Sequence, residues 1–226
     1  MEAIDWNIDY TDLHTVYPTE PLMSETYTID TVILTESHVF REQMFNFKNS
    51  WLTRGLKADF PYIRLKMNGK GIMMSDTPME RNTNHDFIRK ANGDVIIFGL
   101  GLGLVILPLL KKKNVKSVLV VELYQDLIDL VHPILKKHDT ENKLSVIQGD
   151  CFEIHKSIPK EQKFDSVYGD IWIEICTDNY EEMKVLTKNW KNRINRENSN
   201  AFIDHWMKGY LKKQIAEEKR ESFRYW

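Results

Sequence analysis

The sequence has few of the residues that mark unusual protein classes. It contains 10 glycines and 7 prolines in 226 residues, which excludes collagen-like and low-complexity chains. Its two cysteines, Cys151 and Cys176, are too few for a disulfide framework or a cysteine-based metal cluster. The formal net charge is −2, which argues against nucleic acid as a partner bound through counterion release. The histidines follow no metal-ligand spacing, so we expect no metal.

The sequence also lacks segments that would direct it to a membrane. No basic stretch followed by an apolar run opens the chain, as a secretory signal would. The most apolar stretch, residues 94–110, is interrupted by three glycines and a proline and is too short to span a bilayer. We therefore expect a cytoplasmic protein without a membrane partner. Its hydrophobic residues, 42% of the chain, are enough for a core of its own.

Charge is distributed unevenly along the chain. Residues 1–30 contain seven acidic residues and no lysine or arginine, whereas residues 188–226 contain ten basic and five acidic residues. Two interpretations remain open. The segments are either solvated and contact one another, or they form an acidic lid and a basic patch for an anionic substrate.

A helix and a hairpin are predicted in the first third of the chain. Residues 35–55 have a helical pattern that ends at a glycine. Residues 62–67 and 71–74 are strand-like and flank Asn68-Gly69, which is typical of a type I′ hairpin turn. We assign residues 1–76 to an N-terminal extension that contains this helix and hairpin.

The next helix is predicted from its capping residues. Thr77 suits the N-cap, Pro78 suits the first helical position, and Glu80 would complete a capping box. From this point, residues 77–226, the pattern alternates. Strands are predicted at 94–98, 117–121, 143–147, 164–168 and 201–204, and helices at 77–91, 104–112, 124–137, 151–157, 179–195 and 206–221. This alternation predicts an α/β fold, a Rossmann-like, doubly wound and mostly parallel sheet with helices on both faces.

Polar or glycine-rich residues follow four of these strands. They are the glycine loop at 99–103, Glu122, Asp150 and Asp170. In an open α/β sheet, ligands bind beyond the carboxyl ends of the strands. We therefore expect these residues to meet at one ligand site.

The glycine loop, Glu122 and Asp150 point to a nucleoside as the ligand. The loop has the spacing Gly-x-Gly-x-Gly, and Leu104 stands where a dinucleotide fingerprint has its third glycine, so a smaller adenosine ligand is favoured. Glu122 could accept hydrogen bonds from both ribose hydroxyls. Asp150 could accept from an adenine amino group, with the backbone of Cys151 serving the ring nitrogens, or it could cap the following helix.

Asp170 is the candidate for chemistry. A carboxylate at this point could orient or deprotonate an attacking amine or hydroxyl. Trp172 could form the wall of the site or stack on a cation. The alternative is that Asp170 is a turn residue and Trp172 belongs to the core. Glu174 completes the predicted catalytic set.

These motifs carry a family resemblance. The chain from about residue 72 to 172 resembles class I S-adenosylmethionine-dependent methyltransferases, and among them it is most similar to short proteins related to the spermidine synthases. The motifs are residues 95–103, 118–123, 146–150 and 164–170, together with the hairpin at Asn68-Gly69, residues 75–77 and residues 84–86.

The resemblance implies S-adenosyl-L-methionine as cofactor and assigns a role to each candidate. It places the glycine loop near the methionine part of the cofactor, Glu122 at the ribose, Asp150 at the adenine and Asp170 at the reaction centre. Asp76 either contacts the methionine amine or flanks a helix. The full predicted cofactor set is Asp76, Gly99, Leu100, Gly101, Gly103, Glu122, Leu123, Asp150, Cys151 and Asp170.

The sequence departs from spermidine synthases in two places. Those enzymes have an Asp where Leu102 stands. They also have an Asp-x-x-Asp motif after the fourth strand, and in this chain Ile173 replaces the second Asp of that motif. A site without these carboxylates would bind a polyamine poorly, because each buried ammonium needs a paired charge. A further departure is from complete methyltransferase sheets, which usually finish with an extra antiparallel hairpin. Only 56 residues follow Asp170, and most of them are predicted to be helical, so we expect a truncated sheet with the helix at 206–221 covering its edge.

We therefore predict an S-adenosylmethionine-dependent methyltransferase that acts on a small molecule. Three alternatives stay open: a spermidine synthase-like aminopropyltransferase, an enzyme that degrades S-adenosylmethionine by lysis or hydrolysis, and a protein that binds S-adenosylmethionine without turnover. Because spermidine synthase relatives often pair, a homodimer is a further expectation.

Overall fold

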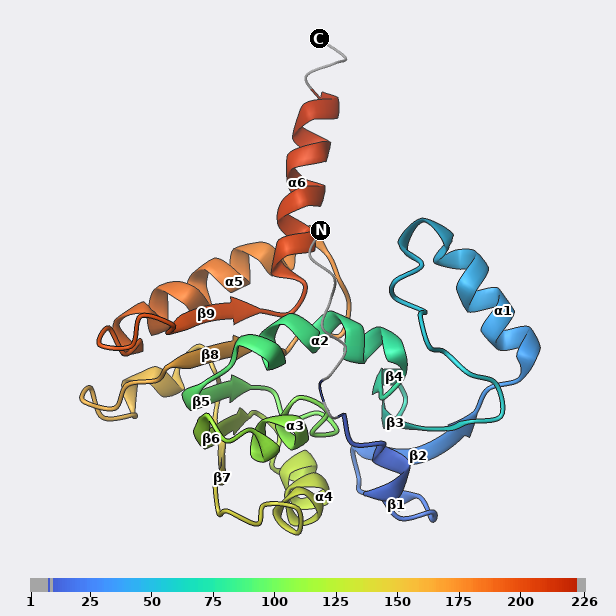
Figure 1. Cartoon of the computed structure of the whole chain (residues 1–226), viewed down its shortest axis with the longest axis horizontal. Helices are drawn as coiled ribbons and strands as arrows, with labels where there is room; N and C mark the ends of the chain where they lie inside the picture. The colour runs from blue at the N-terminus through green and yellow to red at the C-terminus, as the bar shows by residue number, and fades with distance from the viewer. Residues whose placement is uncertain (1–7, 9, 223–226) are drawn as a thin grey trace.

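Two sheets make up the part of the chain that the computed structural model describes, residue 8 and residues 10–222 (Figure 1). An antiparallel sheet precedes residue 76 and a parallel sheet follows it. The antiparallel sheet has the order β1-β2-β3-β4. Its strands are β1 (Leu22–Met23), β2 (Tyr27–Ile33), β3 (Pro61–Met67) and β4 (Gly71–Ser75).

The sequence pattern indicated the β3–β4 hairpin but not β1 or β2. Strand β2 pairs with all of β3. Its residues Tyr27 and Ile29 are buried beneath the sheet, as the two-residue period of a strand requires. On the other face Asp30 forms ion pairs with Arg64 and Lys66, at 2.7 and 2.6 Å.

Two local expectations in this region were wrong. The predicted helix is shorter, because α1 (Glu36–Phe45) ends ten residues before Gly55, and none of its residues is buried. The hairpin turn is not type I′, because that turn needs positive φ at both central residues. Gly69 has φ 78° but Asn68 is not in that region. Instead, Asn68 hydrogen-bonds Thr28 through its side chain and thereby ties the turn to β2.

The parallel sheet has the order β7-β6-β5-β8-β9. All four strand pairs are parallel, and this is the order of a doubly wound Rossmann-like sheet. The strands are β5 (Gly93–Phe98), β6 (Val115–Glu122), β7 (Leu144–Gln148), β8 (Ser166–Gly169) and β9 (Phe202–His205). The predicted fold class is therefore confirmed. The chain reverses direction across the sheet between β5 and β8, which makes their carboxyl ends the switch point.

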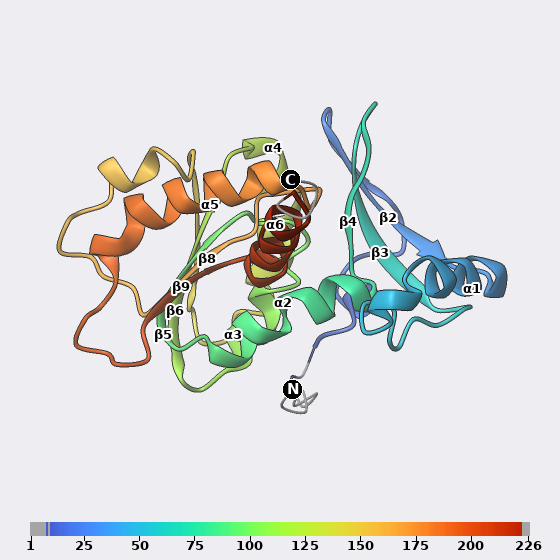
Figure 2. The ribbon, with the colours of Figure 1, turned by 90° about the horizontal axis from the view of Figure 1, so that it is seen from above.

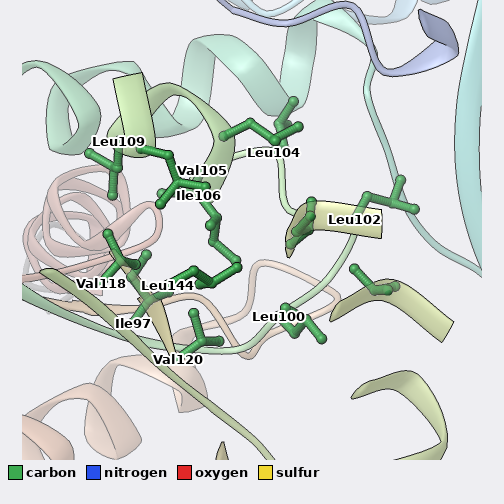
Figure 3. Close-up of a cluster of buried hydrophobic side chains, with 14 of the residues drawn as sticks. Ile97, Leu100, Leu102, Leu104, Val105, Ile106, Leu109, Val118, Val120 and Leu144 are labelled. Atoms are coloured by element: carbon green, nitrogen blue, oxygen red, sulfur yellow. The ribbon is translucent and has the colours of Figure 1, made fainter. Parts of the chain in front are cut away.

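Helices cover both faces of this sheet (Figures 1 and 2). They are α2 (Pro78–Lys90), α3 (Ile106–Lys111), α4 (Gln125–Lys136) and α5 (Thr177–Trp190), and the last helix of the chain is α6 (Lys208–Ser222). Figure 3 shows the core that α3 forms with the sheet, where Ile106 and Leu109 face Val118 and Leu144. The near-continuous apolar runs of β5 and β6 suit strands that are buried on both faces.

The C-terminal end of the chain differs from the expectation. The sheet does end at β9 in the described residues, with no antiparallel hairpin after it. However, α6 does not lie along the edge of β9. It packs at its base against α5, where Leu211 is buried, and then projects away from the body (Figure 1).

Two of the acidic N-terminal residues pair with β3 and with α2. Asp12 forms an ion pair with Arg81 at 3.0 Å, and Asp30 pairs with β3 as described above. The acidic segment is thus bound to its own sheet and to α2. Asp12 and Asp30 do not pair with the basic C-terminal segment, which was one of the two predicted arrangements. Part of the acidic segment, residues 1–7 and 9, lies outside the described residues. None of the described helices is both long and apolar enough to cross a membrane.

Candidate ligand site

A cavity of about 450 Å³ lies between the two sheets. One wall comes from the carboxyl ends of β5, β6 and β8 and the loops that follow them, and the other comes from β2, β3 and β4. Seven of the predicted cofactor residues line the first wall together with Asp170: Gly99, Leu100, Gly101, Glu122, Leu123, Asp150 and Cys151 are found there. The sequence prediction that these strand ends share one site agrees with this geometry.

The glycine loop is shaped by contacts that exclude side chains. Gly99 has φ 100°, and a Cβ there would lie 2.2 Å from the carbonyl oxygen of Asp170. Gly101 has φ 48°, and a Cβ there would lie 2.4 Å from the sulfur of Met74 on β4. Both positions therefore need glycine. The loop packs against the end of β8 at Gly99 and against the N-terminal sheet at Gly101.

Glu122 holds the loop from the end of β6. Its Oε2 accepts a hydrogen bond from the backbone N–H of Leu100 at 2.9 Å, and its Oε1 accepts one from the N–H of Tyr124 at 3.0 Å. The side chain is buried, so these bonds compensate for the loss of water around its charge. Each oxygen keeps a lone pair for a further donor.

Asp150 and Cys151 lie at the neighbouring strand end, after β7. The Asp150 side chain accepts from the N–H of Phe152 at 2.8 Å and so caps the turn that follows it. It also lines the cavity, so the two roles considered for it are compatible. Burial and, to a lesser extent, the nearby Asp150 raise the pKa of the Cys151 thiol to about 12, which keeps it protonated.

Asp170 shares the other end of the cavity with Glu80. The backbone N–H of Asp170 donates to the carbonyl of Phe98 at 2.9 Å, which fixes this carboxylate beside the end of β5. Burial raises the pKa of Asp170 to about 7. Burial and then repulsion by Asp170 raise the pKa of Glu80 to about 8. Among the described residues neither carboxylate accepts a hydrogen bond, so both groups exchange a proton near neutral pH, and a bound cation would favour their charged form.

Two tryptophans stand beside this acidic pair. The indole N–H of Trp172 donates to Glu182 at 2.6 Å, and that of Trp206 donates to Thr83 at 3.0 Å. Both rings line the cavity. Hydrogen bonds thus fix two aromatic surfaces next to two carboxylates, a combination that suits an organic cation.

Three predicted site residues lie elsewhere. Asp76 is fully buried outside the cavity lining, where its carboxylate accepts from the N–H groups of Ile63 and Leu13 and pairs with Arg81. It ties the N-terminal sheet together and is not placed to touch a ligand. Glu174 is exposed and outside the lining. Gly103 packs against α4, because a Cβ there would lie 2.4 Å from a methyl group of Leu135.

Several lining residues were missed by the sequence analysis. Glu80 was assigned to a capping box, but the Thr77 side chain makes no cap hydrogen bond and Glu80 faces the cavity. Tyr27, Lys70 and Met73 come from the N-terminal sheet and Trp206 follows β9. The alternation of apolar and polar residues at 27–33 was the available signal for β2. Nothing in the sequence indicated that this sheet closes the cavity.

Comparison with known proteins identifies the family of this chain. A model of the spermine/spermidine synthase domain matches residues 73–194, just over half of the chain. The chain belongs to this family. The resemblance derived from its motifs, to class I methyltransferases and most closely to spermidine synthase-like proteins, is therefore confirmed. The family match begins on β4 and ends after α5, so it includes both carboxylates of the acidic pair and the whole glycine loop.

Solved structures give more distant likenesses. A spermidine synthase from Thermotoga maritima is 12% identical with a TM-score of 0.47, and the alignment covers 78% of this chain and 52% of that one. An SAH-bound methyltransferase from Podospora anserina is 17% identical with a TM-score of 0.45, covering 80% and 72%. The chain thus spans about half the length of the spermidine synthase. No curated protein matches the chain.

Proposed function

We propose that this protein binds S-adenosylmethionine in the cavity between its sheets and transfers the methyl group to a small amine. The observation that carries the proposal is the hydrogen bond between Glu122 and the amide of Leu100 inside the cavity. It fixes a carboxylate suited to ribose hydroxyls against a loop with room for the atoms attached to that ribose.

The charges that line the cavity support a cationic ligand. The described lining contains the carboxylates of Glu80, Glu122, Asp150 and Asp170, and Lys70 is its basic residue. An adenosyl sulfonium carries a positive charge on sulfur, which this lining would stabilise. Lys70 offers a partner for the carboxylate of intact S-adenosylmethionine.

The residues around Asp170 support an amine as the acceptor. When bound, S-adenosylmethionine supplies an electrophilic methyl group. The protein then has to align the nitrogen lone pair of the acceptor with that methyl, exclude water and take up a proton. Trp172 and Trp206 provide the apolar walls. Asp170, with its pKa near neutral, is placed to accept the proton that the nitrogen loses.

A second candidate function is aminopropyl transfer from decarboxylated S-adenosylmethionine. Glu80 is the observation that favours it, because together with Asp170 it provides two carboxylates for ammonium groups. Against it, Leu102 is fully buried and contributes no carboxylate to the cavity. Ile173 lines the cavity at the position of the family's second Asp. We therefore rank methyl transfer first.

Calorimetric titration with the two forms of the cofactor tests this ranking. We expect intact S-adenosylmethionine to bind more tightly than the decarboxylated form, and Lys70→Ala to reduce the difference. Mass spectrometry after incubation with a panel of small amines should then detect a methylated product. Tighter binding of the decarboxylated form would favour aminopropyl transfer instead. Consumption of S-adenosylmethionine without any amine would favour the lyase or hydrolase alternative, and binding without turnover would favour a binding protein.

Three further properties of the protein are proposed: its oligomeric state, its location and the class of its substrate. A homodimer and a cytoplasmic location are proposed from the family resemblance and from the sequence, and sedimentation and cell fractionation would test them. The small-molecule substrate follows from the size of the cavity, which at about 450 Å³ lies in the range typical of such sites.

A further inference from the structure

The carboxylates of Asp170 and Glu80 lie close enough to repel each other at their end of the cavity. After burial, repulsion by Asp170 is the second cause that raises the pKa of Glu80. A single cation between two such carboxylates relieves the repulsion, so the pair is arranged to share one cationic nitrogen. Glu174 stands four residues after Asp170, but it is exposed and outside the cavity lining. Among the described residues that follow β8, Asp170 is therefore the one carboxylate that lines the cavity.

The lining next to Asp170 is apolar. Ile171, Trp172 and Ile173 follow it in the chain, and all three line the cavity. The side chain of Ile173 is 51% exposed, so a molecule in the cavity can reach it. An ammonium group placed against these residues would give up water without gaining a partner, which costs free energy. A hydrocarbon group in the same place would be favoured, because its burial removes apolar surface from water.

Two indole rings are fixed beside the carboxylates and extend this apolar lining. The indole N–H of Trp206 donates to the hydroxyl of Thr83, and that hydroxyl donates to the backbone carbonyl of Glu80, both at 3.0 Å. The ring of Trp172 meets that of His205 edge-on, with centroids 5.9 Å apart. Both indoles line the cavity. We call the four residues together the apolar surface of the cavity: Ile171, Trp172, Ile173 and Trp206.

From this arrangement we propose that the acceptor is a monoamine whose nitrogen lies between Asp170 and Glu80 and whose short carbon chain ends in an aromatic ring on the apolar surface. This inference rests on the proposed function and names the substrate class of that site. A diamine is disfavoured, because its second ammonium would lie on the apolar surface without a paired charge.

The two carboxylates have separate tasks with such an acceptor. The protonated nitrogen gives one proton to Asp170 and then uses the freed lone pair to form its bond to the methyl carbon. The electrons of the broken carbon–sulfur bond stay on sulfur. The nitrogen of the methylated product carries the positive charge, and Glu80 is placed to pair with it. One nitrogen thus occupies both carboxylates.

Two amines test the proposal, 2-phenylethylamine and 1,4-diaminobutane. Their binding is measured by calorimetry on the full chain loaded with S-adenosylhomocysteine, and their methylation by steady-state kinetics with S-adenosylmethionine. We expect the wild type to bind 2-phenylethylamine about 10- to 100-fold more tightly than the diamine, with kcat/KM differing in the same direction. Equal affinities, or tighter binding of the diamine, would overturn the inference.

Ile173→Asp is the decisive variant. It places a second carboxylate on the apolar surface, so we expect the ratio of the two Kd values to shift about tenfold or more towards the diamine. Ile175→Asp is the matched control, because it makes the same change at an exposed isoleucine outside the cavity lining. Its ratio should equal that of the wild type. An equal shift in both variants, or no shift in Ile173→Asp, would contradict the assignment of the apolar surface.

The same measurements separate this inference from the proposed function. If the protein binds neither S-adenosylmethionine nor S-adenosylhomocysteine and methylates no amine, the proposed function itself fails. If it binds S-adenosylmethionine and methylates 1,4-diaminobutane in preference to 2-phenylethylamine, the proposed function stands and only the aromatic monoamine is refuted.

Discussion

The two ends of the cavity use the same side-chain chemistry in opposite ways. At the adenosine end, Glu122 is buried and each of its oxygens accepts a backbone N–H. At the reaction end, Asp170 and Glu80 accept no hydrogen bond from the described residues, and their pKa values rise to about 7 and about 8. Backbone donors surround the carboxylate at the adenosine end, whereas burial without donors brings the pKa values of the two carboxyl groups at the reaction end close to neutral.

This difference separates binding from reaction within one cavity. The end whose carboxylate is fixed by two backbone hydrogen bonds is suited to bind a constant part of the ligand. The end that gains or loses a proton is suited to the group whose charge changes during transfer. The first two substitutions below should each affect one end and spare the other, and the remaining predictions concern the stability of the fold; they follow in order of decreasing expected effect.

Asp170→Asn should have the largest effect, and it should appear in turnover. Loss of a proton acceptor at the reaction end is expected to lower kcat by about 10² to 10⁴, with the Kd for S-adenosylmethionine changed only a few-fold. Glu174→Gln is the matched control, because Glu174 is exposed and outside the cavity lining. Steady-state kinetics with the amine found by product analysis would measure both. Unchanged kcat in Asp170→Asn would mean that another group takes the proton.

Glu122→Gln should act mainly on binding. The amide keeps only one acceptor oxygen for the two N–H groups of Leu100 and Tyr124, and it loses the charge. We expect the Kd for S-adenosylmethionine to rise about 100-fold, or about 3 kcal/mol. Glu153→Gln serves as control, because Glu153 is exposed and pairs with Lys156. Calorimetry would reveal the difference, and a wild-type Kd in Glu122→Gln would refute the assignment of this end.

Gly99→Ala should disturb both ends through the fold. A Cβ at φ 100° would lie 2.2 Å from the Asp170 carbonyl oxygen, which we expect to lower the free energy of unfolding by about 2 to 4 kcal/mol. Gly209→Ala is the control, because nothing lies within 4 Å of a Cβ there. Urea titration of both variants checks this. Equal stability of the two would show that the loop can relax.

The smallest expected effect is a pH dependence of stability. Because the folded pKa values of Asp170 and Glu80 lie above those of free carboxyl groups, about 4, the folded state binds their protons more tightly. Stability is then greatest below about pH 4 as far as these groups are concerned, and it falls as pH rises through 7 and 8. Thermal melts should show that decline in the wild type and a weaker one in the double variant Glu80→Gln, Asp170→Asn. Parallel curves would contradict the raised pKa values.

Most strands of the parallel sheet could be predicted from the sequence. Helices follow β5, β6 and β8 as expected, whereas the helix predicted at 151–157 was wrong, because only a 3₁₀ turn, Ile154–Lys156, lies between β7 and β8. Every residue that was singled out at the ends of β5, β6, β7 and β8 lies at its strand end as expected. The local physics of strands and their ends was sufficient there, because parallel strands place their carboxyl ends at one edge.

The residues that were misjudged depend on tertiary contacts. Glu80 fits a capping box by spacing, yet it faces the cavity because α2 begins beside the end of β8. Asp76 looked like a ligand contact but is occupied by Leu13, Ile63 and Arg81. Tyr27 could not be found at all without knowing that β2 packs over the end of β6. Spacing along the chain does not contain these long-range neighbours.

The isolation of α1 has a consequence for how the protein opens. None of its residues is buried, and Phe40, Phe45 and Phe47 remain largely exposed. A helix held by so few contacts should exchange its amide hydrogens far earlier than β5 or β6, through local fraying. A protease should therefore nick the chain between residues 36 and 47 while the rest of the fold stays intact.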